Sequence, residues 1–138
     1  SLLSLTAVQA DSPPPAAIAI APTEIKHTTG KDAKALLDAN AAAVAKGKEK
    51  KIVVLDVRTP AEFEEGHIAD AKNVNFRGGN FEKEVAQLDK TQTYLVHCAG
   101  GGRSTSSLEI FQKLGFKTII HLDGGLSSWT KEGNPVVK

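Results

Sequence analysis

The chain contains one cysteine, Cys98, and glycines and an arginine follow it closely. The stretch reads Cys98-Ala99-Gly100-Gly101-Gly102-Arg103-Ser104. A single cysteine cannot form an intramolecular disulfide, so its thiol is either a small buried hydrophobic group or a nucleophile. Three consecutive glycines tolerate positive φ, which lets several backbone N–H groups turn inward and bind an anion. Such amides stabilise a thiolate and lower the pKa of its thiol, so we predict a reactive Cys98.

The neighbouring residues place this stretch between a strand and a helix. Residues 94–96 form an apolar run of the kind found in strands that are buried on both faces. Residues 104–114 have the pattern of a helix, and Gly115 stands where a helix C-cap is expected. Cys98 would then lie beyond the carboxyl end of a strand, where α/β sheets bind ligands. His97 precedes Cys98 and should point to the opposite face, which argues against a Cys–His dyad.

Further apolar and polar patterns alternate along the chain in the manner of an α/β protein. We expect strands at 24–27, at 52–55, around Val74 and Phe76, and at 117–122. We expect helices after the Thr29–Asp32 capping pattern, after Thr59-Pro60, at 81–88 and at 126–131. Strands that alternate with helices in this way predict a parallel sheet flanked by helices.

Composition and charge exclude several classes of function. The chain has 138 residues, 41% of them hydrophobic, and a formal net charge of +1. This length is sufficient for one domain with its own core. Binding to nucleic acids or to a membrane surface normally requires a basic excess, which is missing here. Any bound anion must therefore be held by local geometry, and we expect no nucleic-acid partner.

The N-terminal residues differ in composition from the rest. Residues 1–10 are uncharged, rich in Leu, Ala and Ser, and end in Val8-Gln9-Ala10, as at the cleavage site of a secretory signal. We interpret them as a signal-peptide remnant, which predicts a periplasmic or secreted protein; a disordered apolar tail on a cytoplasmic protein is the alternative. Ten residues are too few to span a bilayer, which takes about 20. Residues 11–23, rich in Pro and Ala, are interpreted as a linker and residues 24–138 as the folded domain.

Three ordered motifs resemble the rhodanese superfamily. The Cys98–Ser104 stretch is similar to the active-site loop of single-domain rhodaneses. Residues 55–63 (Leu-Asp-Val-Arg-Thr-Pro-Ala-Glu-Phe), with 66–68 and 71–74, resemble the amino-terminal signature of the family. Leu122-Asp123-Gly124-Gly125 with Trp129 resembles its carboxy-terminal one. The resemblance covers residues 52–136 and implies a rhodanese-like three-layer α/β fold, with a central parallel sheet flanked by helices.

The resemblance also implies a reaction. Cys98 would take a sulfane sulfur from thiosulfate, a persulfide or a polysulfide, and pass it from a persulfide to cyanide or a thiol. Ala99, Gly100, Gly101, Gly102, Arg103 and Ser104 would bind the anionic donor. Neither a metal nor a cofactor is implied, and we expect a monomer. Residues 99–102 carry no cation, unlike many family members that prefer thiosulfate, and this leaves room for a persulfide or polysulfide donor.

The supporting residues have predicted roles of their own. We expect Asp56 and Arg58 to form a buried polar brace, with contact between Arg58 and substrate as the alternative. Arg103 either touches the anion or braces the loop through a carboxylate. Ser104 is expected to be the helix N-cap, and His67 a hydrogen-bonded structural histidine. Separately, Gly124 and Gly125 should form a tight turn near the pocket, Trp129 should be core, and Asp70 stands where the family commonly has Gly.

Three alternatives to a free-standing sulfurtransferase remain. A phosphatase or arsenate reductase of the same fold would use a loop with five residues between Cys and Arg, whereas four separate Cys98 from Arg103. A non-catalytic interaction module would not need the intact Cys98 loop. A sulfur relay that delivers to a protein acceptor has the same sequence features as the enzyme.

Overall fold

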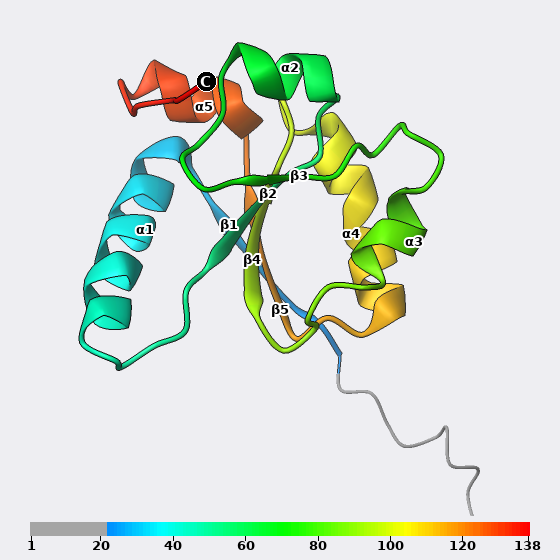
Figure 1. Cartoon of the computed structure of the whole chain (residues 1–138), viewed down its shortest axis with the longest axis horizontal. Coiled ribbons are helices and arrows are strands. Elements are labelled where there is room, and N and C mark those ends of the chain that lie inside the picture. Colours follow the sequence, from blue (N-terminus) through cyan, green and yellow to red (C-terminus); the bar gives the residue numbers. More distant parts are fainter. Residues whose placement is uncertain (1–21) are drawn as a thin grey trace, which may run out of the picture.

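A computed structural model describes residues 22–138, and a five-stranded parallel sheet in the order β1-β5-β4-β2-β3 forms its centre. The strands are β1 (Glu24–Thr28), β2 (Val53–Asp56), β3 (Lys72–Asn73), β4 (Thr93–His97) and β5 (Thr118–Leu122). The helices are α1 (Gly30–Ala45), α2 (Pro60–Glu65), α3 (Phe81–Val85), α4 (Gly102–Leu114) and α5 (Gly125–Lys131). Figure 1 shows α1 and α5 on one face of the sheet and α3 and α4 on the other. The predicted three-layer α/β fold is confirmed.

The hydrophobic core lies on both faces of the sheet. Successive residues of a strand point to opposite faces, so neighbours on one strand join different clusters. On β4, Leu95 packs with Trp129 and Ala33 on the side of α1 and α5. Val96 packs with Phe111 on the side of α4. Burial on both faces explains the continuous apolar runs of the sequence, and Trp129 is core as predicted.

Local sequence signals set several helix ends. The Thr29 side chain accepts a hydrogen bond from the Asp32 amide at 3.3 Å and caps α1. Thr59 and Glu62 form a reciprocal capping box at the start of α2, with Pro60 as its first residue. Gly115 ends α4 in the left-handed conformation, with φ of 82°. These caps confirm the predicted starts of α1 and α2 and the predicted end of α4.

Two predicted elements away from the Cys98 loop are wrong in position or length. The strand expected around Val74 and Phe76 is the two-residue β3, which lies just before them. The amides of Val74 and Phe76 still bond to Asp56 and Val57 at 3.0 Å, so the segment follows the edge of β2 without forming a longer strand. Helix α3 ends at Val85 and not at Leu88, because the amides of Gln87 and Leu88 bond to carbonyls three residues back instead of four.

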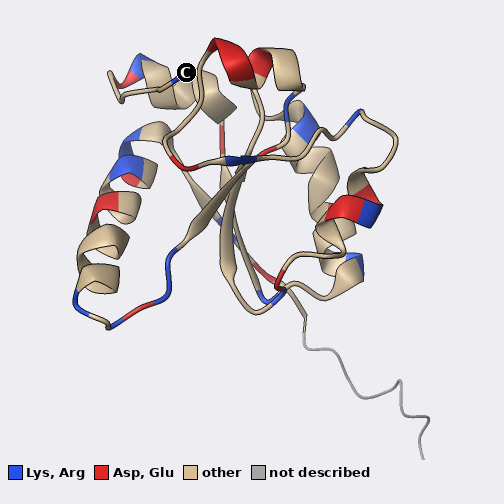
Figure 2. Ribbon diagram, in the orientation of Figure 1, with Lys and Arg blue, Asp and Glu red and all other residues tan. Residues whose placement is uncertain are grey.

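The predicted signal remnant, residues 1–10, lies outside the described residues, as does the predicted linker except for its last two residues, 22 and 23. Both assignments stay predictions. Within residues 22–138, no helix has the length and apolar character needed to cross a bilayer. Figure 2 shows acidic and basic residues interspersed over the helices and loops, in keeping with a net charge of +1.

Candidate active site around Cys98

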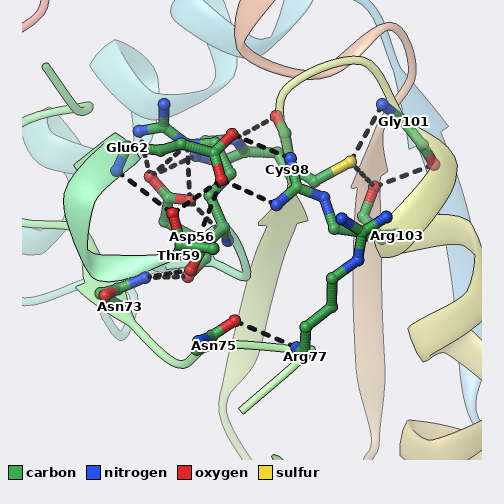
Figure 3. A network of polar contacts seen from close by, with 12 residues as sticks. Asp56, Thr59, Glu62, Asn73, Asn75, Arg77, Cys98, Gly101 and Arg103 are labelled. Atoms are coloured by element: carbon green, nitrogen blue, oxygen red, sulfur yellow. Dashed lines mark hydrogen bonds and ion pairs between the residues drawn. The ribbon is translucent and has the colours of Figure 1, made fainter. Parts of the chain in front are cut away.

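The Cys98 side chain lies where β4 ends and α4 begins, at the carboxyl edge of the sheet. Its Sγ accepts a hydrogen bond from the Gly101 amide at 3.0 Å and lies 3.4 Å from the Ser104 hydroxyl (Figure 3). Only 1% of the surface of Cys98 is exposed. The sulfur is therefore held among hydrogen-bond donors, in a position that only a small reagent can approach.

The hydrogen bonds around the sulfur decide its charge state. Burial by itself raises the pKa of the Cys98 thiol. The Ser104 hydroxyl and the amides of Ser104, Gly101 and Gly100 oppose burial and bring the pKa below its ordinary value. The thiolate form is thereby favoured, in the direction that the sequence predicts.

The loop reaches this geometry with fewer glycines at positive φ than expected. Among the three consecutive glycines, only Gly101 has a positive φ, of 112°. Gly101 is also the N-cap of α4, so the prediction that Ser104 caps this helix is wrong. The helix begins two residues earlier than expected, at Gly102. Ser104 consequently lies in the first helical turn, and its hydroxyl faces the sulfur.

Helix α5 holds the other side of the loop. The amides of Leu126 and Ser127 donate to the carbonyls of Cys98 and Ala99 at 2.8 and 3.1 Å. A Cβ on Gly125 would lie 2.5 Å from the Cys98 carbonyl oxygen, and φ at Gly125 is +60°. The predicted Gly124–Gly125 turn is therefore close to the site, and glycine is required there because the two backbones touch. The carbonyls of Cys98 and Ala99 are thereby bonded to α5.

Arg103 links two helices through a carboxylate. Its guanidinium donates to both carboxylate oxygens of Glu62, on α2, at 2.8 and 2.9 Å (Figure 3). The hydrogen bond from Arg103 is the main reason why the pKa of Glu62 falls from 4.5 to about 2. Of the two roles predicted for Arg103, this geometry fits the brace.

Asp56 and Arg58 form the buried brace that the sequence predicts. The Asp56 carboxylate accepts hydrogen bonds from the Arg58 amide and guanidinium, and Arg58 also donates to the Gly66 carbonyl at 2.7 Å. His97 lies beside them, with Nε2 3.7 Å from Asp56, and burial lowers the pKa of His97. The His97 ring bonds to the Cys98 carbonyl and not to its sulfur.

His67 and Asp70 also take structural positions. The His67 ring stacks on Phe63 at 3.7 Å between centroids and its Nδ1 is 2.8 Å from the Phe63 carbonyl oxygen. It is hydrogen-bonded as predicted, and the structure does not bring it to Cys98. Asp70 has φ of 64°, the left-handed conformation that glycine adopts at low cost. The left-handed backbone also explains why the family commonly has glycine at this position.

A chain of polar side chains that we did not single out from the sequence leads away from Ser104. His121 Nε2 lies 2.8 Å from the Ser104 hydroxyl, and His121 Nδ1 lies 2.7 Å from an Asp123 oxygen. His27 Nδ1 lies 2.8 Å from the same oxygen. These three residues present donor atoms within 4.8 Å of one another, close enough to surround a cation. Both histidines already bond to one carboxylate oxygen, so we treat the group as a hydrogen-bonded chain.

One sequence signal could have identified this chain. His121 and Asp123 are two residues apart at the end of a strand, and side chains at that spacing share a face. The sequence does not show that this strand, β5, pairs with β4. Arg77 is a second residue that we did not single out. Figure 3 shows its side chain extending from the segment after β3 toward the region of Cys98 and Arg103.

Comparisons with known proteins agree with this fold. The rhodanese-like domain model matches residues 26–132. The "Probable adenylyltransferase/sulfurtransferase MoeZ" of Mycobacterium tuberculosis is 33% identical over 62% of this chain, and the match spans 22% of that protein's length. The "Thiosulfate sulfurtransferase 16, chloroplastic" of Arabidopsis thaliana is 34% identical over 59% of this chain and 76% of its own length.

A solved structure shows the same architecture. The crystal structure of a rhodanese-related protein from Thermoplasma volcanium aligns with a TM-score of 0.64 at 32% identity. The alignment covers 81% of this chain and 97% of that one. The parallel sheet, the loop after β4 and the family model that spans most of the chain lead to one conclusion: the chain belongs to the rhodanese-like domain family.

Proposed function

We propose that the chain is a sulfurtransferase that works through a persulfide on Cys98. The observation that carries this proposal is the position of the Cys98 sulfur, 3.0 Å from the Gly101 amide and 3.4 Å from the Ser104 hydroxyl, with a lowered pKa. The thiolate attacks the outer sulfur of thiosulfate, the S–S bond of the donor breaks, and sulfite leaves with the bonding electrons. Cyanide or a thiolate then removes the terminal sulfur and restores the Cys98 thiolate.

The donor that fits this site is a small anion. Because only 1% of Cys98 is exposed, the site favours a compact reagent. Residues 99–102 carry no cation, and the guanidinium of Arg103 is paired with Glu62. The loop amides and Arg77, which extends toward the site, are the groups that we assign to the anion. Thiosulfate is the donor that we propose, and a hydropersulfide or polysulfide is the competing donor that the experiment separates.

Mass spectrometry of the intact protein tests the proposal. After incubation with thiosulfate the mass should rise by about 32 Da, one sulfur atom, on Cys98, and cyanide should remove the added mass. Polysulfide and glutathione persulfide are tested in parallel to rank the donors. The Cys98→Ser variant should keep the circular dichroism spectrum and gain no mass. The proposal fails if none of the three donors adds sulfur to Cys98.

A rhodanese-fold phosphatase fits the site less well. Such an enzyme needs a loop that surrounds a tetrahedral oxyanion, and here four residues separate Cys98 from Arg103. The guanidinium of Arg103 is also paired with the carboxylate of Glu62. Hydrolysis of a general phosphatase substrate at a rate comparable to sulfur transfer would reverse this choice.

A sulfur relay to a protein acceptor is the second candidate. The observation in its favour is that the matched region forms only 22% of the M. tuberculosis relative, where the same domain is part of a larger protein. A relay would form the Cys98 persulfide but transfer its sulfur to small acceptors slowly. Turnover with cyanide and with small thiols, compared with the rate of persulfide formation, separates the two functions.

A further inference from the structure

The Ser104 hydroxyl has three acceptors within reach and one hydrogen to donate. Its Oγ lies 2.8 Å from His121 Nε2, 3.2 Å from the Gly101 carbonyl and 3.4 Å from the Cys98 sulfur. A hydroxyl donates one hydrogen bond and accepts two. Where that hydrogen points therefore depends on whether His121 Nε2 carries a proton.

The bond between His121 and Asp123 fixes part of this answer. Asp123 accepts at 2.7 Å from His121 Nδ1, so Nδ1 carries a hydrogen. In the neutral ring, Nε2 has no hydrogen and accepts from Ser104, whose hydroxyl then points away from the sulfur. In the imidazolium, Nε2 donates to the Ser104 oxygen, and the hydroxyl hydrogen is free to bond to the sulfur.

We propose that Cys98 loses its proton through Ser104 to His121, and that Asp123 holds His121 for this purpose. The thiol hydrogen passes to Ser104 Oγ as the Ser104 hydroxyl hydrogen passes to His121 Nε2. The products are a thiolate that accepts a hydrogen bond from Ser104, and an imidazolium that donates to Ser104 and to Asp123. Atoms and charge balance, because one proton has moved between two side chains of the same protein.

The surroundings of His121 suit this task. The His121 side chain is buried, at 3% exposure, while half of the Asp123 side chain is exposed. The proton acceptor is thus shielded near the sulfur and connected to solvent at its far end. The other ionisable groups that face it are His27 on β1, with the two rings edge to face at 5.6 Å, and His97 on β4. Thr105 Oγ1, on α4, lies 3.5 Å from Nε2 and is uncharged.

This proposal rests on Cys98 as the nucleophile of the proposed function, and it makes His121 a positioning residue because it acts through Ser104. It also revises one expectation from the sequence. A histidine partner for Cys98 was set aside because His97 points to the opposite face from Cys98. The partner in the structure is His121, on the neighbouring strand, with Ser104 between the two side chains.

Ultraviolet titration of the thiolate tests the proposal without any sulfur donor. Cys98 is the only cysteine, so the thiolate absorbance reports on this residue alone. We expect His121→Gln to raise the pKa of Cys98 by about one unit, or tenfold in its ionisation constant, because Ser104 loses the partner that takes its proton and leaves its hydroxyl hydrogen bonded to the thiolate. Ser104→Ala should shift it in the same direction. A chelator in all samples removes any adventitious metal ion.

A double variant and two further variants complete the test. His121 acts only through Ser104, so Ser104→Ala with His121→Gln should shift the pKa little more than Ser104→Ala alone. Asp123→Asn, at an exposed position, should give a smaller shift in the same direction and serves if His121→Gln does not fold. His67→Gln, the same substitution at a histidine away from Cys98, should leave the titration unchanged.

Two outcomes would overturn the proposal. The first is a folded His121→Gln protein, or Asp123→Asn in its place, with an unchanged pKa of Cys98. The second is a double variant whose shift equals the sum of the single shifts, which would mean that His121 acts independently of Ser104. A protein that forms no persulfide but shows the expected pKa shifts would contradict the proposed function and still support proton transfer from Cys98 through Ser104 to His121.

Discussion

Two networks of polar side chains flank Cys98, and they differ in their contact with solvent. On the β2 side, the side chains of Asp56 and His97 are 0% exposed and that of Arg58 is 6% exposed. On the β5 side, the chain from Ser104 through His121 ends at Asp123, which is 52% exposed. Both contain an aspartate and a histidine. Residue types alone therefore do not determine whether such a pair braces the fold or moves a proton.

The difference follows from what burial requires of a carboxylate. A charge removed from water has to be paired and its lone pairs filled. Asp56 meets this need with hydrogen bonds from the Arg58 amide and guanidinium, which hold it in one arrangement. Asp123 keeps contact with water, so the charge on His121 can change without leaving an unpaired buried group. The buried network suits a brace and the solvent-connected one suits proton transfer.

The largest effect on stability is expected at the buried network. Asp56→Asn leaves Arg58 with an uncompensated buried charge and should lower the free energy of unfolding by about 3–5 kcal/mol. Asp123→Asn, the same change at the exposed carboxylate, should lower it by less than about 1 kcal/mol. Urea unfolding of both variants measures the difference. Equal losses would show that the two networks do not differ as their exposure suggests.

An intermediate effect is expected at the half-buried pair of Glu62 and Arg103. The pKa of Glu62 falls from 4.5 to about 2 in the folded protein, so the pair contributes stability above pH 4.5 that is lost as the pH falls through about 2. Because nearly a third of the Glu62 side chain is exposed, screening reduces this contribution, and Glu62→Gln should cost about 1–2 kcal/mol at neutral pH.

Unfolding measured as a function of pH checks this prediction. The difference in unfolding free energy between Glu62→Gln and the unmodified protein should shrink as the pH falls from 4.5 toward 2. The same measurement on Asp123→Asn serves as a comparison, since the Asp123 carboxylate is more exposed than that of Glu62. A Glu62→Gln deficit that stays constant over this range would mean that the pair contributes through shape and not through charge.

The smallest effect is expected at the exposed Arg77. Its removal should leave the free energy of unfolding unchanged to within about 0.5 kcal/mol, as for most surface substitutions. If Arg77 attracts the anionic donor, Arg77→Ala should raise KM for thiosulfate roughly 2–5-fold at low salt, with kcat unchanged, and added salt should remove the difference. An uncharged organic trisulfide as donor should show no change.

A surface cation on the opposite face of the sheet supplies the control. Lys31→Ala, on α1, removes one positive charge from the surface without touching the segment around Cys98. It should leave KM for thiosulfate unchanged. An equal rise in KM for both variants would assign the effect to overall charge, and no rise for Arg77→Ala would leave donor binding to the loop amides.

The sequence by itself predicted the order of strands and helices and the place of Cys98 between a strand and a helix, and the resemblance to the family added the brace of Asp56 and Arg58. The element order and the place of Cys98 follow from local features: apolar runs, helix caps, and glycines that follow a strand. A cap such as Thr29 bonds to an amide only a few residues away, so the start of the helix can be predicted from the local sequence.

Only the tertiary structure decided what surrounds the sulfur. Ser104 was expected to be a helix cap, but it lies beside Cys98 because α4 begins two residues earlier than predicted, at Gly102. Arg103 took Glu62 as its partner because α2 lies beside the start of α4. His121 reached Ser104 because β5 pairs with β4, a contact between segments far apart in the chain. Strand neighbours and helix packing are set by burial over the whole domain, and the residues of one strand do not record which other strand will lie beside it.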